Sequence, residues 1–175
     1  MSAEWWIQTD SGGLAQGDLL PDCRFPVFVE EPLSVDDREP DEIEVKQQRL
    51  IIVTQTCYLE NNKVEFVALC PIHTLSEFEE VNLEFAAKGR WENVRKGRIE
   101  GLHLLAAPDD PANNQSSLVV DFGHIISLPL EYLTTHAEST ADRWRLQSPF
   151  LEHFSQAFAR FFMRVGLPSS IPPFK

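Results

Sequence analysis

The sequence predicts an α+β protein, mainly β with helices, in which a small antiparallel barrel carries a helical insertion and a C-terminal helix. Several short apolar or alternating runs are separated by turn signals, which is typical of short strands. Helical spacing is present in residues 74–100 and again in residues 148–165. A length of 175 residues suits one domain, so we expect residues 1–175 to fold as a single unit.

Residues 50–53 form the most apolar run, Leu50-Ile51-Ile52-Val53, and predict a strand that is buried on both faces. The chain then turns polar through Thr54, Gln55, Thr56 and Cys57. Polar groups at the rim of a core are common in binding and catalytic sites. The alternative is that these side chains only satisfy backbone groups at a strand end.

The polar residues 60–63 separate this strand from a second apolar run at 64–72, which predicts a β-hairpin. We expect further short strands at 4–8, 24–29, 102–106, 117–123, 124–129 and 144–147. The paired tryptophans in the first of these are typical of a lid on the core.

The insertion at 74–100 begins with Thr74 or Ser76 as the helix N-cap, and residues 130–133 predict one further helical turn. The C-terminal helix has Ser148 as its N-cap. Its apolar stripe consists of Phe150, Phe154, Phe158 and Phe162, widened by Leu151, Ala157, Phe161 and Val165. The opposite face carries His153, Gln156, Arg160 and Arg164, which form a solvated face or, alternatively, a groove for an acidic partner.

The charge is strongly acidic, because 15 basic and 27 acidic residues give a net charge of −12. Such a chain has no general attraction to nucleic acid or to anionic lipid, so contact with them requires a local basic patch. Residues 30–44 form an acidic, solvated loop. The one notable basic cluster lies in residues 88–98 and consists of Lys88, Arg90, Arg95, Lys96 and Arg98.

Three cysteines without CxxC spacing favour neither a disulfide framework nor a zinc site, and we expect no metal and no cofactor. No apolar run is long enough to cross a membrane and no secretory signal is visible, so we expect a cytoplasmic protein without membrane contact. Phosphate-binding glycine loops and zinc-protease or serine-hydrolase motifs are absent. A cysteine hydrolase built on Cys57 requires a histidine such as His103 or His124 nearby, and a buried inert thiol is the alternative.

RNA cleavage by transesterification requires a group that takes the 2′-hydroxyl proton, a cation for the phosphate and an acid for the leaving oxygen. Arg24 and Arg49 flank the first predicted sheet, and Thr54 and Thr56 lie on it. The sequence permits these residues to supply part of such a site without a metal ion.

The order Gly17-Asp18-Leu19-Leu20, then Arg24-Phe25-Pro26-Val27, then Leu50 to Thr54 resembles the MazF/PemK-like toxin family, whose members are SH3-like barrels. The resemblance implies a metal-independent endoribonuclease of a toxin–antitoxin or phage-defence system, with single-stranded RNA and an antitoxin or other protein as partners. Arg24 and Thr54 match the catalytic positions of that family, with Thr56 as a second choice. A homodimer is the expected assembly.

This chain departs from the short toxins in its length, its acidic loop and its 74–100 insertion, and therefore resembles a divergent member. In the ribonuclease hypothesis, substrate is held by Arg49, Gln55, Arg90, Arg95, Lys96 and Arg98, which must meet Arg24 and Thr54 at one groove. The competing hypothesis is a non-catalytic adaptor or regulator that binds other proteins.

Overall fold

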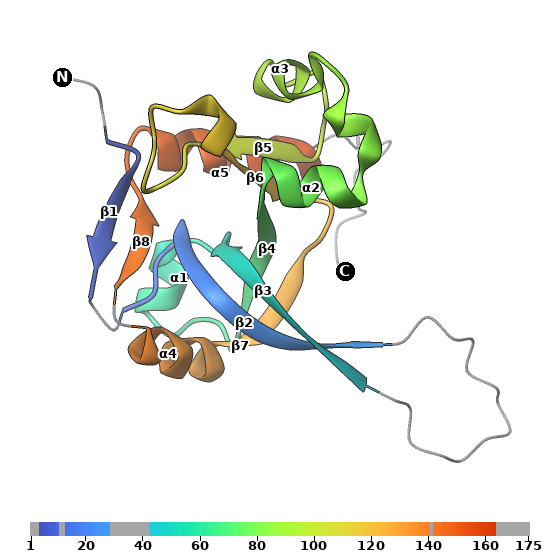
Figure 1. The fold of residues 1–175 in the computed structure, drawn as a ribbon. Helices are drawn as coiled ribbons and strands as arrows, with labels where there is room; N and C mark the ends of the chain where they lie inside the picture. Colours follow the sequence, from blue (N-terminus) through green and yellow to red (C-terminus); the bar gives the residue numbers. More distant parts are fainter. Residues whose placement is uncertain (1–3, 11–12, 29–42, 141, 164–175) are drawn as a thin grey trace, which may run out of the picture.

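The computed structural model describes residues 4–10, 13–28, 43–140 and 142–163 (Figure 1). The strands in these ranges are β1 (Trp6–Thr9), β2 (Asp18–Phe28), β3 (Ile43–Ile52), β4 (Phe66–Thr74), β5 (Leu102–Leu105), β6 (Leu118–Asp121), β7 (Ile126–Pro129) and β8 (Arg143–Leu146). The helices are α1 (Thr56–Glu60), α2 (Leu75–Val81), α3 (Arg90–Arg95), α4 (Leu130–Ser139) and α5 (Phe150–Phe162), with 3₁₀ turns at Leu83–Ala86 and Asn114–Ser116. The α+β class is therefore confirmed, and helices occupy both the 74–100 insertion and the C-terminal region as expected.

All strands pair antiparallel in one sheet of order β1-β8-β2-β3-β4-β6-β5, and β7 pairs with β4. The predicted closed barrel is wrong, because no strand pairing joins the end strands β1 and β5 among the described residues. Both end strands are only four residues long. They approach each other through one side-chain hydrogen bond, in which Trp6 Nε1 donates to the carbonyl of Ala106 over 2.8 Å. The sheet is thus strongly curved but open.

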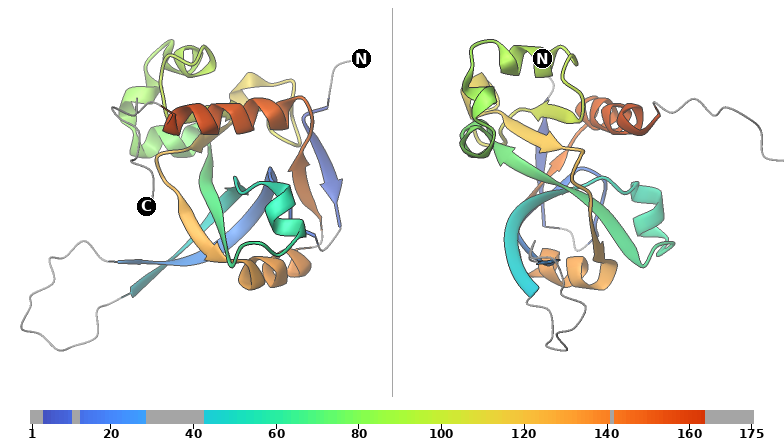
Figure 2. Two further views of the ribbon diagram at one scale, coloured as in Figure 1. Left: turned by 180° about the vertical axis from the view of Figure 1, so that it is seen from behind. Right: turned by 90° about the vertical axis from the view of Figure 1, so that its right-hand side faces the viewer.

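Strand β3 is the centre of the sheet, and the predicted burial on both faces is confirmed. Leu50, Ile51 and Ile52 are fully buried and Val53 is nearly so. Ile51 and Val53 pack in the same cluster as Phe154 of α5, whereas Leu50 and Ile52 pack with Leu133 of α4. The curved sheet therefore has one core under each of these two helices (Figure 2).

The predicted β3–β4 pairing is confirmed by the register Leu50↔Pro71, Ile51↔Cys70 and Ile52↔Leu69. The connection is not a four-residue turn, because helix α1 lies between the strands. Asn62 has a positive φ of 48° just after this helix, a conformation that asparagine tolerates better than most residues. The polar turn signal of the sequence thus marks the end of a helix rather than the tip of a hairpin.

Two helical predictions change in extent. Residues 130–133 begin a helix that continues to Ser139, because Leu133 and Ala137 both reach the core on helical spacing. In α5, Phe154 is fully buried but Phe162 is 51% exposed, so the apolar stripe does not bury its last phenylalanine. Trp6 is buried in the core as expected. The acidic loop 30–44 falls almost entirely outside the described residues.

Helix α5 covers the end of the sheet formed by β5 and β6, where the rings of Phe122, Phe154 and Phe158 meet. Helices α2 and α3 lie at the same end of the molecule, and α4 lies at the opposite end (Figure 1). No helix in the described part of the chain is both long and apolar enough to span a membrane. The molecule therefore presents two separate ends, one built on α3 and α5 and the other on α1 and α4.

Candidate binding groove between α3 and α5

The threonines predicted to act in catalysis both bind the backbone. Thr54 Oγ1 accepts a hydrogen bond from the N–H of Ala68 over 2.8 Å, and Thr56 Oγ1 accepts one from the N–H of Gln16 over 3.1 Å. Gln16 in turn donates from its side-chain amide to the carbonyl of Val53. These contacts favour the alternative reading of the strand end, in which its hydroxyls satisfy backbone donors and join β3 to its neighbours.

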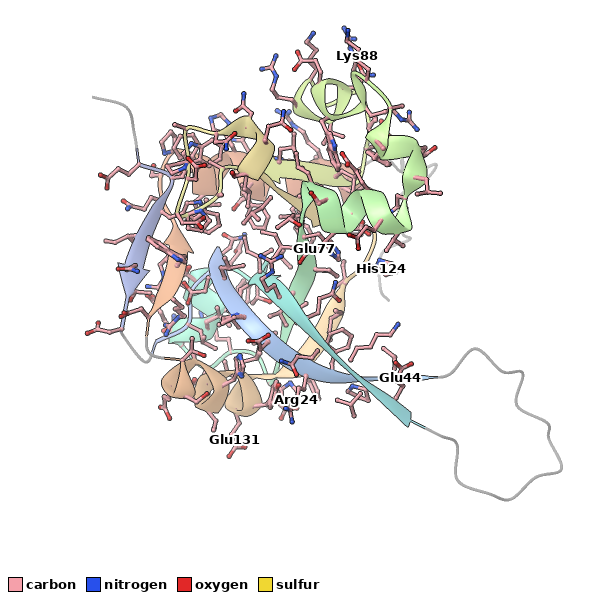
Figure 3. The ribbon with its side chains drawn as sticks, viewed as in Figure 1. Arg24, Glu44, Glu77, Lys88, His124 and Glu131 are labelled. Atoms are coloured by element: carbon pink, nitrogen blue, oxygen red, sulfur yellow. The ribbon has the colours of Figure 1, made fainter. Side chains whose placement is uncertain are left out.

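Arg24 lies on an exposed position of β2, where it pairs with Gln47 of β3. Its backbone N–H donates to the hydroxyl of Tyr132 in α4 over 2.8 Å. Figure 3 shows Arg24 at the α4 end of the molecule and Lys88 at the α3 end. The structure therefore does not bring Arg24 together with the 88–98 basic cluster, as the ribonuclease hypothesis requires.

The basic cluster itself is partly paired within the insertion. Arg90 contacts Glu84 over 2.8 Å and lies over the ring of Phe85. Arg98 donates to the side chain of Asn93. Arg95 and Lys96 share the single carboxylate of Glu92, at 2.7 and 2.9 Å. These two cations lower the pKa of Glu92 to about 2, mainly through their hydrogen bonds to it.

Arg95 and Lys96 also line a groove of about 390 Å³ whose other wall is α5. Helix α5 contributes His153, Gln156 and Arg160, and strand β5 contributes His103 at the floor. The lining carries the cations Arg95, Lys96 and Arg160 and the carboxylate of Glu100, and the carboxylate of Glu92 pairs with Arg95 and Lys96 beside it. The groove is thus a local basic surface on a chain whose net charge is −12.

His103 is the most deeply placed polar group of the groove. Its ring stacks on Phe122 at 5.9 Å and lies at the same distance from the ring of Phe154. Burial lowers the pKa of His103 to about 4, and the nearby His153 lowers it further in the same direction. At neutral pH the imidazole of His103 is therefore uncharged and offers one donor and one acceptor to a ligand.

Three of these groove residues, His153, Gln156 and Arg160, were identified in the sequence on one helix face, for which a groove for an acidic partner was the alternative to a solvated face. His153 and Arg160 lie on the polar face of α5, opposite its phenylalanines. The basic helix face and the basic 88–98 cluster were visible separately in the sequence. Only the packing of α5 beside β5 shows that they form one surface.

A second hollow of about 480 Å³ lies between the β2–β3 ribbon and α2 and contains His73, Asp121 and His124. His124 Nδ1 lies 3.0 Å from Asp121 Oδ2, and His73 Nε2 lies 3.3 Å from the side-chain nitrogen of Gln48. Burial lowers the pKa of His73, against the opposing charges of nearby carboxylates. The predicted substrate residue Arg49 pairs with Glu77, which lines this hollow and is labelled beside His124 in Figure 3.

The remaining candidate from the sequence is the thiol of Cys57, which requires a histidine beside it. Cys57 is exposed rather than buried, and its thiol lies 3.9 Å from the side-chain oxygen of the exposed Gln55. Among the described residues no hydrogen bond links Cys57 to a histidine, and the two other thiols, Cys23 and Cys70, are buried. The part of the chain that the structure describes contains no group of three or more His, Cys, Asp or Glu side chains placed to hold a metal ion.

Comparisons with protein-family models, with curated proteins and with solved structures found no match for this chain. The resemblance to MazF/PemK-like toxins therefore stays a prediction from the sequence. The geometry of the groove between α3 and α5 is the basis for the functional proposal.

Proposed function

We propose that this protein is a binding module, an adaptor or regulator, that takes a short acidic segment of a partner protein into the groove between α3 and α5. The observation that carries the proposal is the convergence of Arg95 and Lys96 with Arg160, which come from elements far apart in the chain. Arginine binds carboxylates through two parallel hydrogen bonds, as Arg95 does with Glu92. An acidic side chain of the partner therefore binds Arg95 and Lys96 in competition with Glu92, and another binds Arg160 on the facing wall.

A protein segment fits the groove better than RNA for two reasons. RNA is a long polyanion that extends beyond the groove onto a chain of net charge −12, whereas a short acidic segment does not. Single-stranded RNA also binds by stacking its bases on open aromatic faces. Of the two phenylalanines in the groove, Phe122 is only 2% exposed, and Phe161 is half-buried with its ring packed against those of Phe122 and Phe162.

The ribonuclease hypothesis is tested directly by an RNA-cleavage assay. Purified wild-type protein is incubated with single-stranded RNA and compared with Arg24→Ala and Thr54→Ala. If the binding proposal is right, no variant differs from wild type in RNA cleavage, because neither residue belongs to the groove. Cleavage by wild type that both substitutions abolish would support the endoribonuclease instead, and with it the cytoplasmic toxin predicted from the sequence.

The binding proposal is tested by fluorescence anisotropy with a labelled hexaglutamate peptide and a labelled hexauridine RNA. We expect the peptide to bind wild type and to bind Arg95→Ala/Arg160→Ala about tenfold more weakly, which corresponds to about 1.4 kcal/mol. The matched control is Arg24→Ala/Lys46→Ala, which removes the same charge elsewhere and should change affinity less than about twofold. Equal losses in the two double variants would contradict the proposal, and tighter binding of the RNA would reassign the groove to nucleic acid.

A further inference from the structure

A second groove, with the opposite charge, lies at the other end of the molecule. It has a volume of about 910 Å³ and runs between the α1–β4 connection on one side and β7 with α4 on the other. Its described lining includes Leu14, Leu59, Glu65, Phe66, Leu130 and Glu138. We refer to it as the α1–α4 groove.

The floor of the α1–α4 groove is apolar and includes an exposed aromatic side chain. Leu14 and Leu59 belong to the core beneath it, and Leu130 packs against the same core. Phe66, the first residue of β4, is 56% exposed although it is one of the largest apolar side chains in the chain. Exposed aromatic residues in a depression are frequent anchors of protein interfaces.

The rim of the α1–α4 groove is acidic. Glu60 and Glu65 lie on one side, and Glu131 and Glu138 lie on α4, where Figure 3 shows Glu131 directed away from the body of the molecule. The described lining contains four carboxylates and neither lysine nor arginine. An apolar floor between acidic rims is complementary to a segment with one apolar and one basic face.

Hydrogen bonds within the protein hold the two walls of the α1–α4 groove together. Strand β7 pairs with β4 in the register Phe66↔Pro129, and the N–H of Leu130 donates to the carbonyl of Glu65 over 2.8 Å. The hydroxyl of Thr134 donates to the carbonyl of Leu130 within α4. Because these contacts hold both sides together, binding orders few groups of the protein and loses little free energy in doing so.

We propose that the α1–α4 groove binds a basic amphipathic segment of a partner protein, with apolar side chains on Phe66 and Lys or Arg side chains at the glutamates. The charge selects this occupant over others. Anionic lipid and nucleic acid are repelled by the rim. A second copy of this chain carries the same net charge of −12 and is disfavoured by long-range repulsion. The proposal is independent of the α3–α5 groove, since the two surfaces share no residue.

The test uses two labelled synthetic peptides with the same leucine face, one carrying lysines and the other glutamates on the polar face. We expect wild type to bind the lysine peptide and not the glutamate peptide in fluorescence anisotropy. Glu65→Gln/Glu131→Gln/Glu138→Gln should weaken binding about tenfold or more, and Phe66→Ala should weaken it by a similar factor. The control Glu44→Gln/Glu80→Gln/Asp109→Asn removes the same charge from exposed sites elsewhere and should change affinity less than about twofold.

Equal weakening by the two triple variants would overturn the proposal, because the peptide would then respond only to net charge. Binding of both peptides with equal affinity would also overturn it. Sedimentation of wild type and Phe66→Ala identifies a second copy as the occupant if wild type dimerises and the variant does not. Binding of wild type, but not of Phe66→Ala, to phosphatidylcholine vesicles would assign the groove to a lipid surface. Circular dichroism of each variant establishes that it is folded.

Discussion

Asp18 and Arg143 form a buried ion pair although they lie at opposite ends of the chain. Arg143 Nε donates to Asp18 Oδ2 over 3.1 Å. The side chain of Arg143 is 1% exposed and that of Asp18 is 0% exposed. Asp18 also accepts hydrogen bonds from Arg145 and from the N–H of Ala15. The carboxylate thus joins the first residue of β2 to strand β8 and fixes the edge of the sheet that the terminal strands form.

We predict that Asp18→Ala lowers the free energy of unfolding by about 3–5 kcal/mol, because it removes the carboxylate from a buried guanidinium. Asp18→Asn should cost less, since the amide oxygen still accepts one hydrogen bond. The control is Asp22→Asn, an exposed position of the same strand, which should change stability by less than about 0.5 kcal/mol. Urea denaturation gives the three values, and an Asp18→Ala variant as stable as the control would contradict the prediction.

Gly17 precedes this aspartate in a backbone conformation that requires glycine. Its φ is +83°, and a Cβ at this position would lie 2.9 Å from Leu146 Cβ and 3.0 Å from Leu151 Cδ1. Gly97 has a similar φ of +66° with no atom within 4 Å of such a Cβ. We predict that Gly97→Ala costs about 1 kcal/mol from the backbone alone, and that Gly17→Ala costs about 3 kcal/mol because overpacking is added.

Thermal or urea unfolding of the two alanine variants measures this difference directly. The pair is informative because the backbone strain is nearly the same in both. Equal destabilisation would mean that Leu146 and Leu151 move aside without cost and that the contact does not hold Gly17 in place.

The sequence was sufficient to predict the elements whose signals are local. The apolar run at Leu50–Val53 predicted the central strand, and the phenylalanine spacing predicted α5, because burial dictates both patterns. The closed barrel was wrong because closure depends on whether two distant strands, β1 and β5, meet in register. No pattern within either strand carries that information.

The candidate site shows the same division between local and long-range information. Arg95 and Lys96 belong to the basic run that was predicted to hold an RNA substrate, which stays a prediction, and the structure places them on the wall of a groove. Their meeting with Arg160 depends on the packing of Phe154 against Phe122, which places α5 beside β5. The backbone N–H groups that bind the hydroxyls of Thr54 and Thr56 lie elsewhere in the chain, so no local pattern in the sequence could reveal them.

The start of α2 carries a capping box formed by Thr74 and Glu77. Glu77 also pairs with Arg49 of the central strand β3. Glu77 N–H donates to Thr74 Oγ1 over 3.2 Å, and Thr74 N–H donates to Glu77 Oε2 over 2.7 Å. We predict that Thr74→Ala costs about 1 kcal/mol of stability, because a helix donor loses its acceptor. Thr74→Ser keeps the hydroxyl and should cost less than half as much. A serine variant as unstable as the alanine variant in urea denaturation would show that the methyl group, not the cap, matters.

His103 should make the stability of the protein depend on pH between about 4 and 6.5. Its pKa is lowered to about 4 in the folded chain, chiefly by burial, and is about 6.5 in an unfolded chain. Between these values the unfolded state binds more protons, so the free energy of unfolding falls as the pH falls. The contribution is fully present above about pH 6.5 and amounts to about 3 kcal/mol, most of which is lost by pH 4.

Urea denaturation at pH 7.5, 6 and 5 tests this dependence in wild type and in His103→Leu. Leucine does not titrate and fits an apolar site beside Phe122 and Phe154, so the variant should lose less stability than wild type between pH 7.5 and 5. His73, whose pKa burial also lowers, acts with the same sign and remains in both proteins, as do the carboxylates that titrate at lower pH. Identical pH profiles for the two proteins would mean that its half-buried place in the α3–α5 groove does not lower the pKa of His103.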